Sequence, residues 1–175
     1  MEKKEIRKLI IAKMAEQDKQ LKAQRDEELL LDVLKSTAYK DAQVIATYMA
    51  FGHEFATLPL IEQAIADGKT VLTPKTYPKG RMIFGEYKKE ELMRTNFGLL
   101  EPKSELAFPK DKIDLIHVPG VAFNDKGFRV GYGAGYYDRY LADFCGATVS
   151  TIYDFQRYSF EEESHDVAVR EVFVR

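Results

Sequence analysis

The apolar positions at the start of the chain recur with the period of a helix. Ile6, Ile10 and Met14 follow one another at i, i+4 spacing, and residues 2–35 contain many strong helix formers and neither Gly nor Pro. A second apolar stripe consists of Leu29, Leu30, Val33 and Leu34. Between the two stripes, the polar pair Gln17-Asp18 interrupts the pattern. We therefore predict helix over residues 2–35, with a break near this pair.

Farther along the chain, short apolar segments alternate with segments of helical period. Strands are predicted at residues 43–50, 70–75, 81–87, 114–120, 147–154 and 170–175. Helices are predicted at 58–68, where Gly68 suits a C-terminal cap, and at 136–144. Residues 88–112 carry mixed charges and two prolines and are predicted to be mostly irregular loop. The alternation is typical of an α/β fold with a largely parallel sheet, in which the continuous apolar strand at 114–120 is buried on both faces.

Composition and charge narrow the classes of partner. The 175 residues are enough for one domain with a sizeable core, and 45% hydrophobic with 31% charged residues is usual for such a domain. The formal net charge of −2 gives no overall attraction to nucleic acid or acidic lipid, so neither is expected as a partner and any anion site has to be local. The apolar run 9–12 is too short for a signal peptide, and no segment approaches the ~20 residues of a membrane span. A cytoplasmic location is expected.

Cys145 is the only cysteine, so it cannot form a disulfide within the chain. It stands between Phe144 and Gly146 at the end of a predicted helix. A nucleophilic role is the less common explanation for such a position. Cys145 is therefore expected to be a small buried apolar residue.

The stretch VGYGAGYYDRYL, residues 130–141, places three glycines at alternate positions before a predicted helix. Glycines allow a close approach of the backbone and positive φ angles, and unpaired amides at a helix start attract anions. The stretch matches neither the Walker loop nor the full G-x-G-x-x-G fingerprint. Arg129 before the loop and Arg139 after it favour a phosphate site. A tight connection flanked by two solvated arginines is the alternative.

Two carboxylates and two basic residues are further candidates for a nucleotide site. Asp138 lies in the first turn of the predicted helix, and Asp166 precedes the last predicted strand. Two carboxylates together with phosphate oxygens suit Mg²⁺, whereas helix capping by Asp138 and a turn role for Asp166 are the structural alternatives. Lys3 and Arg7 share one face of the first predicted helix. An ordinary charged surface is the alternative for these two.

Other polar residues follow the predicted strands or lie within them. Glu54 comes after the first predicted strand, at the carboxyl end, where open α/β sheets bind ligands. His53, His117 and His165 form no metal-ligand pair at helical spacing. His117, inside an apolar strand, is expected to be a hydrogen-bonded core residue. No Ser/His/Asp or Cys/His arrangement is suggested.

Residues 119–141, PGVAFNDKGFRVGYGAGYYDRYL, resemble the signature of the 5-formyltetrahydrofolate cyclo-ligase family, also called 5,10-methenyltetrahydrofolate synthetases. The family pattern reads approximately P-G-x-A-F-D-x-x-G-x-R-L-G-x-G-x-G-Y-Y-D, and nearly every fixed position is present. Further similar stretches follow the family's order along the chain: KKEIR, residues 47–75, FGLLEP, YDFQ and ESHDVAV. The resemblance therefore covers essentially the whole chain.

This resemblance implies an ATP-dependent cyclisation of 5-formyltetrahydrofolate to 5,10-methenyltetrahydrofolate, with release of ADP and phosphate through a phosphorylated formyl intermediate. It implies a single α/β domain over residues 1–175, with a mostly parallel central sheet flanked by helices on both faces in three layers. The N-terminal helix is expected to pack near the active-site crevice. ATP as co-substrate, Mg²⁺ and small-molecule substrates are implied, and a monomer or weak homodimer is expected.

The resemblance also assigns residues of this sequence to the site. Those implied for ATP are Lys3, Lys4, Arg7, Arg129, Val130, Gly131, Tyr132, Gly133, Ala134, Gly135, Tyr136 and Tyr137. Those implied for the folate are Met49, Glu54, Tyr132, Gly133, Ala134, Gly135 and Tyr136, with Glu54 hydrogen-bonding the pterin. Asp138 and Asp166 are implied for Mg²⁺, and Lys75 matches a basic position that could meet phosphate or folate. No covalent nucleophile is required.

Departures from the family pattern are few. Asn124 stands where the family usually has Asp, Val130 replaces Leu, and Ala134 occupies a position that is often Gly or Lys. Phe55-Ala56 replaces a commoner hydrophobic-acidic pair and leaves the details of pterin contact open. Two other functions stay under consideration: a module that binds nucleotide or folate without turnover, and a sugar-phosphate isomerase or acyl-transfer enzyme on a similar fold. Retention of the charged site positions argues against the first, and the lack of a placed general base or nucleophile argues against the second.

Overall fold

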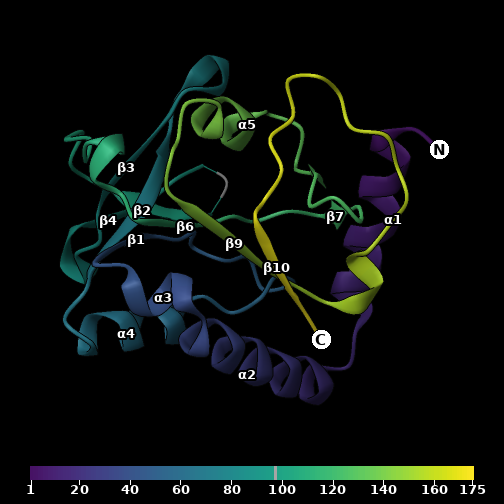
Figure 1. Cartoon of the computed structure of the whole chain (residues 1–175), viewed down its shortest axis with the longest axis horizontal. Helices are drawn as coiled ribbons and strands as arrows, with labels where there is room; N and C mark the ends of the chain where they lie inside the picture. Colours follow the sequence, from purple (N-terminus) through teal and green to yellow (C-terminus); the bar gives the residue numbers. More distant parts are fainter. Residues whose placement is uncertain (97) are drawn as a thin grey trace.

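A six-stranded sheet forms the centre of the molecule (Figure 1), a computed structural model that describes residues 1–96 and 98–175. Its strands are β1 (Val44–Ala46), β2 (Thr70–Thr76), β3 (Met82–Glu86), β6 (Leu115–His117), β9 (Ala147–Ile152) and β10 (Glu171–Val174). They lie in the order β10-β9-β6-β1-β2-β3, with every neighbouring pair parallel except β2 and β3. The predicted largely parallel α/β sheet is therefore confirmed.

The core of the molecule lies on both faces of this sheet because side chains alternate along each strand. Ile45 pairs in register with Val71 and Leu115 and belongs to one apolar cluster, whereas the next residue, Ala46, belongs to the other. All three residues of β6 are buried. The prediction of a strand buried on both faces is confirmed.

Helices cover the two faces of the sheet, which gives three layers. The helices are α1 (Lys3–Glu16), α2 (Lys19–Lys35), α3 (Thr37–Asp41), α4 (Leu58–Ala66) and α5 (Tyr136–Leu141). Figure 1 shows α2, α3 and α4 on one side of the sheet and α5 on the other. Among the described residues, no helix combines the length and the apolar character that a membrane crossing requires.

The predicted break in the N-terminal helical region lies between α1 and α2. Gln17 is extended, and the Asp18 side chain accepts a hydrogen bond from the Leu21 amide at 2.9 Å, which caps α2. On α1, Ile6, Ile10 and Met14 pack against a small hairpin made of β7 (Ala122–Phe123) and β8 (Arg129–Val130). This packing fixes α1 beside the glycine-rich loop that follows β8.

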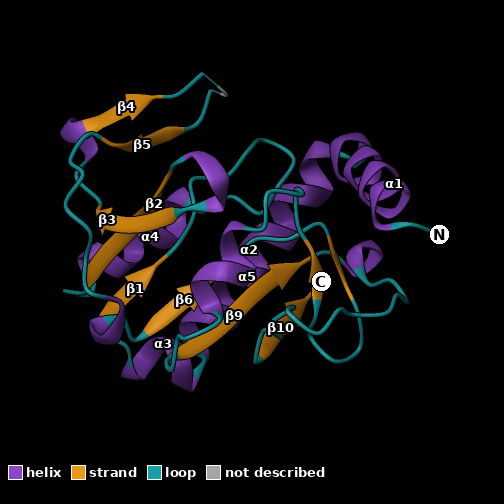
Figure 2. Cartoon of the chain, turned by 90° about the horizontal axis from the view of Figure 1, so that it is seen from above, coloured by secondary structure: helices purple, strands orange, loops and turns teal. Residues whose placement is uncertain are grey.

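Two local predictions are wrong and a third is incomplete. Residues 88–112, predicted to be mostly irregular loop, contain an antiparallel hairpin of β4 (Leu92–Arg94) and β5 (Leu100–Pro102) that projects beyond the β3 edge (Figure 2). The first strand ends at Ala46, four residues earlier than expected. Cys145 is exposed rather than buried. Phe97, which begins the FGLLEP stretch, lies outside the described residues.

Candidate active site

A cavity of about 660 Å³ opens at the carboxyl ends of β1, β2 and β6. Segments that are far apart in the sequence meet there: the start of α1, the loop after β1, the glycine-rich loop and the segment before β10. The residues that the resemblance assigned to ATP, folate or Mg²⁺ line this cavity except Lys4, which is exposed, and Lys75, which is buried elsewhere. The position agrees with the general placement of ligand sites in open α/β sheets.

The glycine-rich loop, residues 131–135, has a backbone that only glycine adopts easily. Gly133 and Gly135 have φ angles of +108° and +73°, in the left-handed region that L side chains resist. Arg7 of α1 donates from Nε to the Gly131 carbonyl at 2.7 Å, so helix and loop are tied together. Since α5 has six residues, the side chains around the loop, more than a helix dipole, have to supply the positive charge for an anion.

The two arginines that flank the loop have different environments. Arg129 is only 6% exposed, and its Nε has no hydrogen-bond partner among the described residues. Burial lowers the pKa of Arg129, while the charge of Asp138 opposes that shift. Arg139 is exposed and donates to the Ala134 carbonyl at 2.8 Å, which agrees with a surface role. The solvated alternative is therefore wrong for Arg129.

Lys3 lies between two carboxylates at one end of the cavity. Its Nζ is 3.1 Å from Glu163 and 3.4 Å from Asp166. Burial alone would lower the pKa of Lys3, but the hydrogen bond to Glu163 and the charge of Asp166 raise it. Lys3 is therefore held in the ammonium form, next to residues that precede β10.

Asp138 and Asp166 are the two residues expected to hold Mg²⁺, and Asp138 contacts the segment that contains Asp166. The Asp138 carboxylate accepts a 3.4 Å hydrogen bond from the Val167 amide, one residue beyond Asp166. The Asp166 side chain is 3% exposed. In residues 1–96 and 98–175, no group of three or more His, Cys, Asp or Glu side chains is arranged to hold a metal ion. Two carboxylates fit a Mg²⁺ ion whose other ligands are phosphate oxygens and waters.

Glu54 provides a buried carboxyl at another part of the cavity. It is 5% exposed and accepts a 2.7 Å hydrogen bond from the Phe51 amide. Burial raises the pKa of Glu54 to about 6, against the opposing hydrogen bonds of Phe51 and Tyr132 and the charge of Lys22. A carboxyl with this pKa can change its protonation state near neutral pH.

His117 is the core histidine that its apolar strand predicts. Its two ring nitrogens lie 2.8 Å from the Thr47 hydroxyl and 2.9 Å from the Thr151 hydroxyl. Burial lowers the pKa of His117 to about 3, so the ring stays neutral. The prediction of a hydrogen-bonded core residue is confirmed.

The β4–β5 hairpin forms part of the cavity wall, and the residue patterns did not predict this. Leu99, Leu100 and Glu101 line the cavity, and Glu101 accepts hydrogen bonds from the Thr76 amide at 3.0 Å and the Thr76 hydroxyl at 2.8 Å. The FGLLEP stretch was the available signal, since Glu101 is its acidic residue. Lys75 does not line the cavity and instead donates to the Lys103 carbonyl at 3.0 Å.

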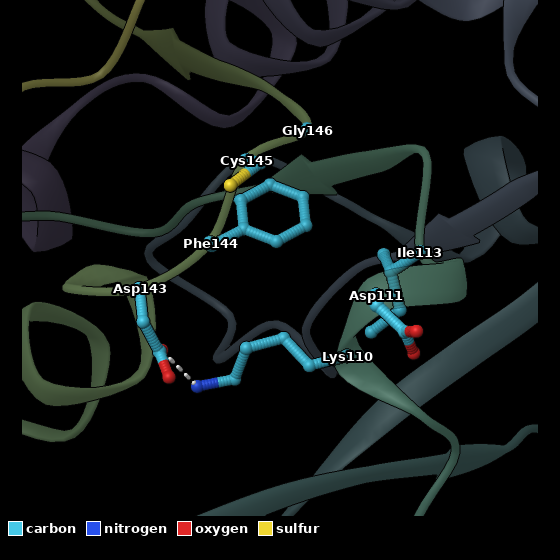
Figure 3. Close-up of a pocket in the computed structure, with 7 residues that line it drawn as sticks. All are labelled: Lys110, Asp111, Ile113, Asp143, Phe144, Cys145 and Gly146. Atoms are coloured by element: carbon cyan, nitrogen blue, oxygen red, sulfur yellow. Dashed lines mark hydrogen bonds and ion pairs between the residues drawn. The ribbon is translucent and has the colours of Figure 1, made fainter.

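A second, smaller cavity of about 370 Å³ lies at the opposite ends of the strands, next to the amino ends of β6 and β9 (Figure 3). Lys110 crosses it and donates to the Tyr140 carbonyl at 2.8 Å and to Asp143 at 2.6 Å. Its ammonium also lies 3.9 Å from the centre of the Tyr140 ring. The exposed Cys145 also lines this smaller cavity.

Comparisons with known proteins agree with this arrangement. The model of the 5-formyltetrahydrofolate cyclo-ligase family matches residues 1–175. A 5-formyltetrahydrofolate cyclo-ligase of Haemophilus influenzae is 32% identical over 126 residues, which are 69% of this chain and 67% of that protein. The protein of the same name from Escherichia coli K12 is 35% identical over 108 residues, 59% of either chain. The chain thus matches about three fifths to two thirds of the length of these curated relatives.

A solved structure supports the fold over nearly the full chain. The solution structure of the Aquifex aeolicus 5,10-methenyltetrahydrofolate synthetase superposes with a TM-score of 0.86 at 26% identity. The superposition covers 99% of this chain and 90% of that one. The fold is therefore the single α/β domain expected from the sequence, with helices on both faces of a mainly parallel sheet.

Proposed function

The chain belongs to the 5-formyltetrahydrofolate cyclo-ligase family, and from this premise we propose that it converts 5-formyltetrahydrofolate to 5,10-methenyltetrahydrofolate with consumption of ATP. ADP and phosphate are the other products. One observation carries the proposal. A single cavity gathers the basic residues of α1 and β8, the glycine-rich loop, the carboxylates of Asp138 and Asp166 and the buried Glu54.

Three basic side chains in the cavity, those of Lys3, Arg7 and Arg129, support binding of the ATP phosphates. Five acidic residues line the cavity as well: Glu54, Glu101, Asp138, Glu163 and Asp166. The positive charge is therefore local. Arg129 supplies the most specific support. Its buried Nε has no partner in residues 1–96 and 98–175, which is costly unless a ligand completes the hydrogen bonds, and a phosphate oxygen is a suitable acceptor.

Asp138 and Asp166 are the residues proposed to hold Mg²⁺. Bound with the nucleotide, the ion would neutralise charge on the phosphates. The ammonium of Lys3 contacts Asp166 in the ligand-free protein. Entry of a cation at these carboxylates would free Lys3 for a phosphate oxygen, because the two positive groups compete for the same oxygens.

The folate is proposed to occupy the part of the cavity that contains Met49, Glu54 and Tyr136. The formyl group is an amide, and its oxygen is a poor leaving group until it is phosphorylated. Transfer of the terminal phosphate of ATP to that oxygen, attack by N10 on the formyl carbon and departure of phosphate then close the ring. The side chains position the two substrates and neutralise charge, and no covalent nucleophile is needed.

The proposal is tested by incubating the purified chain with 5-formyltetrahydrofolate and Mg-ATP. We expect the absorbance of the methenyl product to increase, with one ADP and one phosphate released for each product molecule. Omission of ATP, Mg²⁺ or protein should each prevent the increase. A folded protein that binds both substrates but forms no product across pH and Mg²⁺ concentration would show a binding module instead of an enzyme.

A further inference from the structure

Two arginines hold backbone carbonyls of the glycine-rich loop, one near each end of it. Arg7 Nε donates to the Gly131 carbonyl at 2.7 Å, and Arg139 donates to the Ala134 carbonyl at 2.8 Å. Arg7 lines the cavity and is one of the residues proposed for ATP, whereas Arg139 is exposed and does not line it. Any role of Arg139 in the site therefore has to act through the loop.

The turn between β2 and β3 makes room for the Arg139 guanidinium. Gly80 lies in this turn with a φ angle of +75°, and a Cβ atom there would be 2.7 Å from the guanidinium carbon of Arg139 and 3.1 Å from the Ala134 carbonyl oxygen. In the same turn, the Tyr77 carbonyl lies 3.4 Å from the hydroxyl of Tyr136, at the start of α5. The turn can pack this closely on the loop because residue 80 has no side chain.

The Arg139 contact determines which way one peptide group of the loop points. In a trans peptide the C=O and N–H bonds point in opposite directions, and no peptide bond among the described residues is cis. Because the Ala134 carbonyl is directed toward Arg139, the N–H of the same peptide group, that of Gly135, points away from Arg139. Gly135 lines the cavity, and its N–H has no backbone partner among the described residues. This N–H can therefore donate to a ligand in the cavity.

We propose that Arg139 is a positioning residue of the ATP site. It keeps the Ala134 carbonyl turned away from the cavity, so that the Gly135 N–H is presented to a phosphate of ATP. The inference rests on the function proposed above and deepens it, because it makes nucleotide affinity depend on a residue outside the cavity.

The orientation of this peptide group needs a restraint because glycine allows more than one. Gly135 has a φ angle of +73°, and a glycine can change between such a conformation and others at little steric cost. A flip of the peptide would replace the N–H by the carbonyl oxygen at the cavity wall. Two oxygens that both carry negative charge repel each other, so the flipped loop would bind a phosphate less tightly.

Arg139 is suited to this restraint by its charge and by its surroundings. A hydrogen bond from a guanidinium to a carbonyl is stronger than one between neutral groups. The backbone at Gly80 limits the positions that the guanidinium can take. The side chain therefore favours the outward carbonyl over the flipped one although it is exposed to solvent.

Arg139→Met tests the inference, because it removes the donor and keeps a side chain of similar length. Lys79→Met is the matched control: Lys79 is exposed and precedes Gly80 in the turn, so this variant removes one positive charge from the same region. Calorimetric titration with Mg-ATP should give a Kd about tenfold higher for Arg139→Met and a wild-type Kd for Lys79→Met. In turnover, the KM for ATP should increase by the same factor in Arg139→Met, while the KM for 5-formyltetrahydrofolate stays unchanged.

The backbone amide of Gly135 provides a direct readout. In proton–nitrogen correlation spectra of wild type, saturating Mg-ATP should move the Gly135 amide proton downfield, because the N–H gains a phosphate acceptor. In Arg139→Met at saturating Mg-ATP, the shift should be smaller, because the peptide spends part of its time flipped. A role of Arg139 in stability alone would not change this shift.

The outcomes separate this inference from the proposed function. If wild type does not bind Mg-ATP, both are overturned. If wild type binds Mg-ATP but forms no methenyl product, the proposed function alone is overturned, since the affinities still decide the role of Arg139. Wild-type affinity in Arg139→Met, folded as judged by circular dichroism, would overturn the inference. An equal loss of affinity in Lys79→Met, or a Gly135 resonance that Mg-ATP does not move in wild type, would overturn it as well.

Discussion

The strands of the parallel sheet have a cavity at each end, and only the cavity at the carboxyl ends contains buried polar atoms without a hydrogen-bond partner among the described residues. At the amino ends of β6 and β9, Lys110 has two hydrogen-bond acceptors and an aromatic ring. At the carboxyl ends, Arg129 and Tyr137 each bury a polar atom that has no partner among the described residues. Buried polar atoms are almost always paired in a folded chain. Arg129 and Tyr137 both line the cavity proposed to bind the substrates, whereas Thr73, whose hydroxyl is likewise unpaired among the described residues, does not.

The difference also affects stability. A paired lysine at the surface stabilises the fold by a small amount, whereas a buried guanidinium and a buried carboxylate cost free energy until substrate is bound. We therefore expect apolar substitutions to stabilise the fold at the carboxyl ends of the strands and not at the amino ends. Substitutions at the carboxyl ends should lower activity without lowering stability. Substitutions at the amino ends should lower stability without lowering activity.

The largest effect is expected for Arg129→Met. Loss of the buried guanidinium removes a charge that we propose to contact the phosphates, so kcat/KM for ATP should fall by about 10²–10³-fold. Thermal stability should stay equal or increase, because an unpaired buried charge is replaced by an apolar chain of similar length. Turnover assays and thermal unfolding of the same preparations measure both. Wild-type activity in this variant would show that Arg129 is not part of the site.

Asp138→Asn is expected to lower turnover by about 10²-fold and to abolish its dependence on Mg²⁺, since the amide no longer offers a negative oxygen to the ion. The matched control is Asp143→Asn, which changes the same group at the amino edge and should keep wild-type turnover. Titration of Mg²⁺ in the methenyl assay measures both variants. An unchanged Mg²⁺ response in Asp138→Asn would remove Asp138 from the metal site.

Glu54→Gln should lower turnover and raise stability. The pKa of Glu54 is about 6 in the folded protein against an ordinary 4.5, so the folded state binds the proton more tightly than the unfolded state. Its contribution to stability is therefore present below pH 4.5 and is lost as the pH rises through about 6. Above that pH, ionised Glu54 costs about 2 kcal/mol, which the neutral amide avoids.

For Glu54→Gln we accordingly expect Tm to increase by roughly 4–8 °C at pH 8 and by little at pH 4. Thermal unfolding at the two pH values measures the difference. Equal Tm changes at both values would mean that burial of the charge does not control the stability of this region.

The smallest effect is expected for Lys110→Met, at the amino edge. Asp143 is largely exposed, so the ion pair contributes little, and the loss of the hydrogen bonds and the ring contact should cost about 1 kcal/mol. Tm should decrease by about 2–4 °C while turnover stays at the wild-type value. A marked loss of turnover would mean that the two edges are coupled through the sheet.

The sequence predicted the parts of the fold that rest on strong local patterns. The α1 and α2 stripes, the break at Gln17-Asp18 and the positive φ after α4 at Gly68 were all readable from residue type and spacing. The β4–β5 hairpin was not, because its strands are three residues long and have no alternating apolar pattern. Its position depends on tertiary contacts, such as that of Glu101 with Thr76.

The candidate site was predicted by resemblance more than by residue chemistry. Charge patterns alone left Lys3, Arg7 and Arg129 as plausible surface residues, since burial of a guanidinium cannot be read from one sequence. Cys145 was misjudged for the same reason: it lies in the exposed connection between α5, which ends at Leu141, and β9. The contact between His53 and Tyr132 joins residues 79 positions apart, which residue type and spacing do not predict.

The central claim is that the cavity at the carboxyl edge performs an ATP-driven cyclisation and the cavity at the amino edge does not take part. The most direct test measures methenyl product from 5-formyltetrahydrofolate and Mg-ATP with wild type, Arg129→Met and Lys110→Met side by side. We predict rapid product formation by wild type and Lys110→Met and almost none by Arg129→Met, with all three proteins folded. Equal rates in all three, or no product from any of them, would contradict the account.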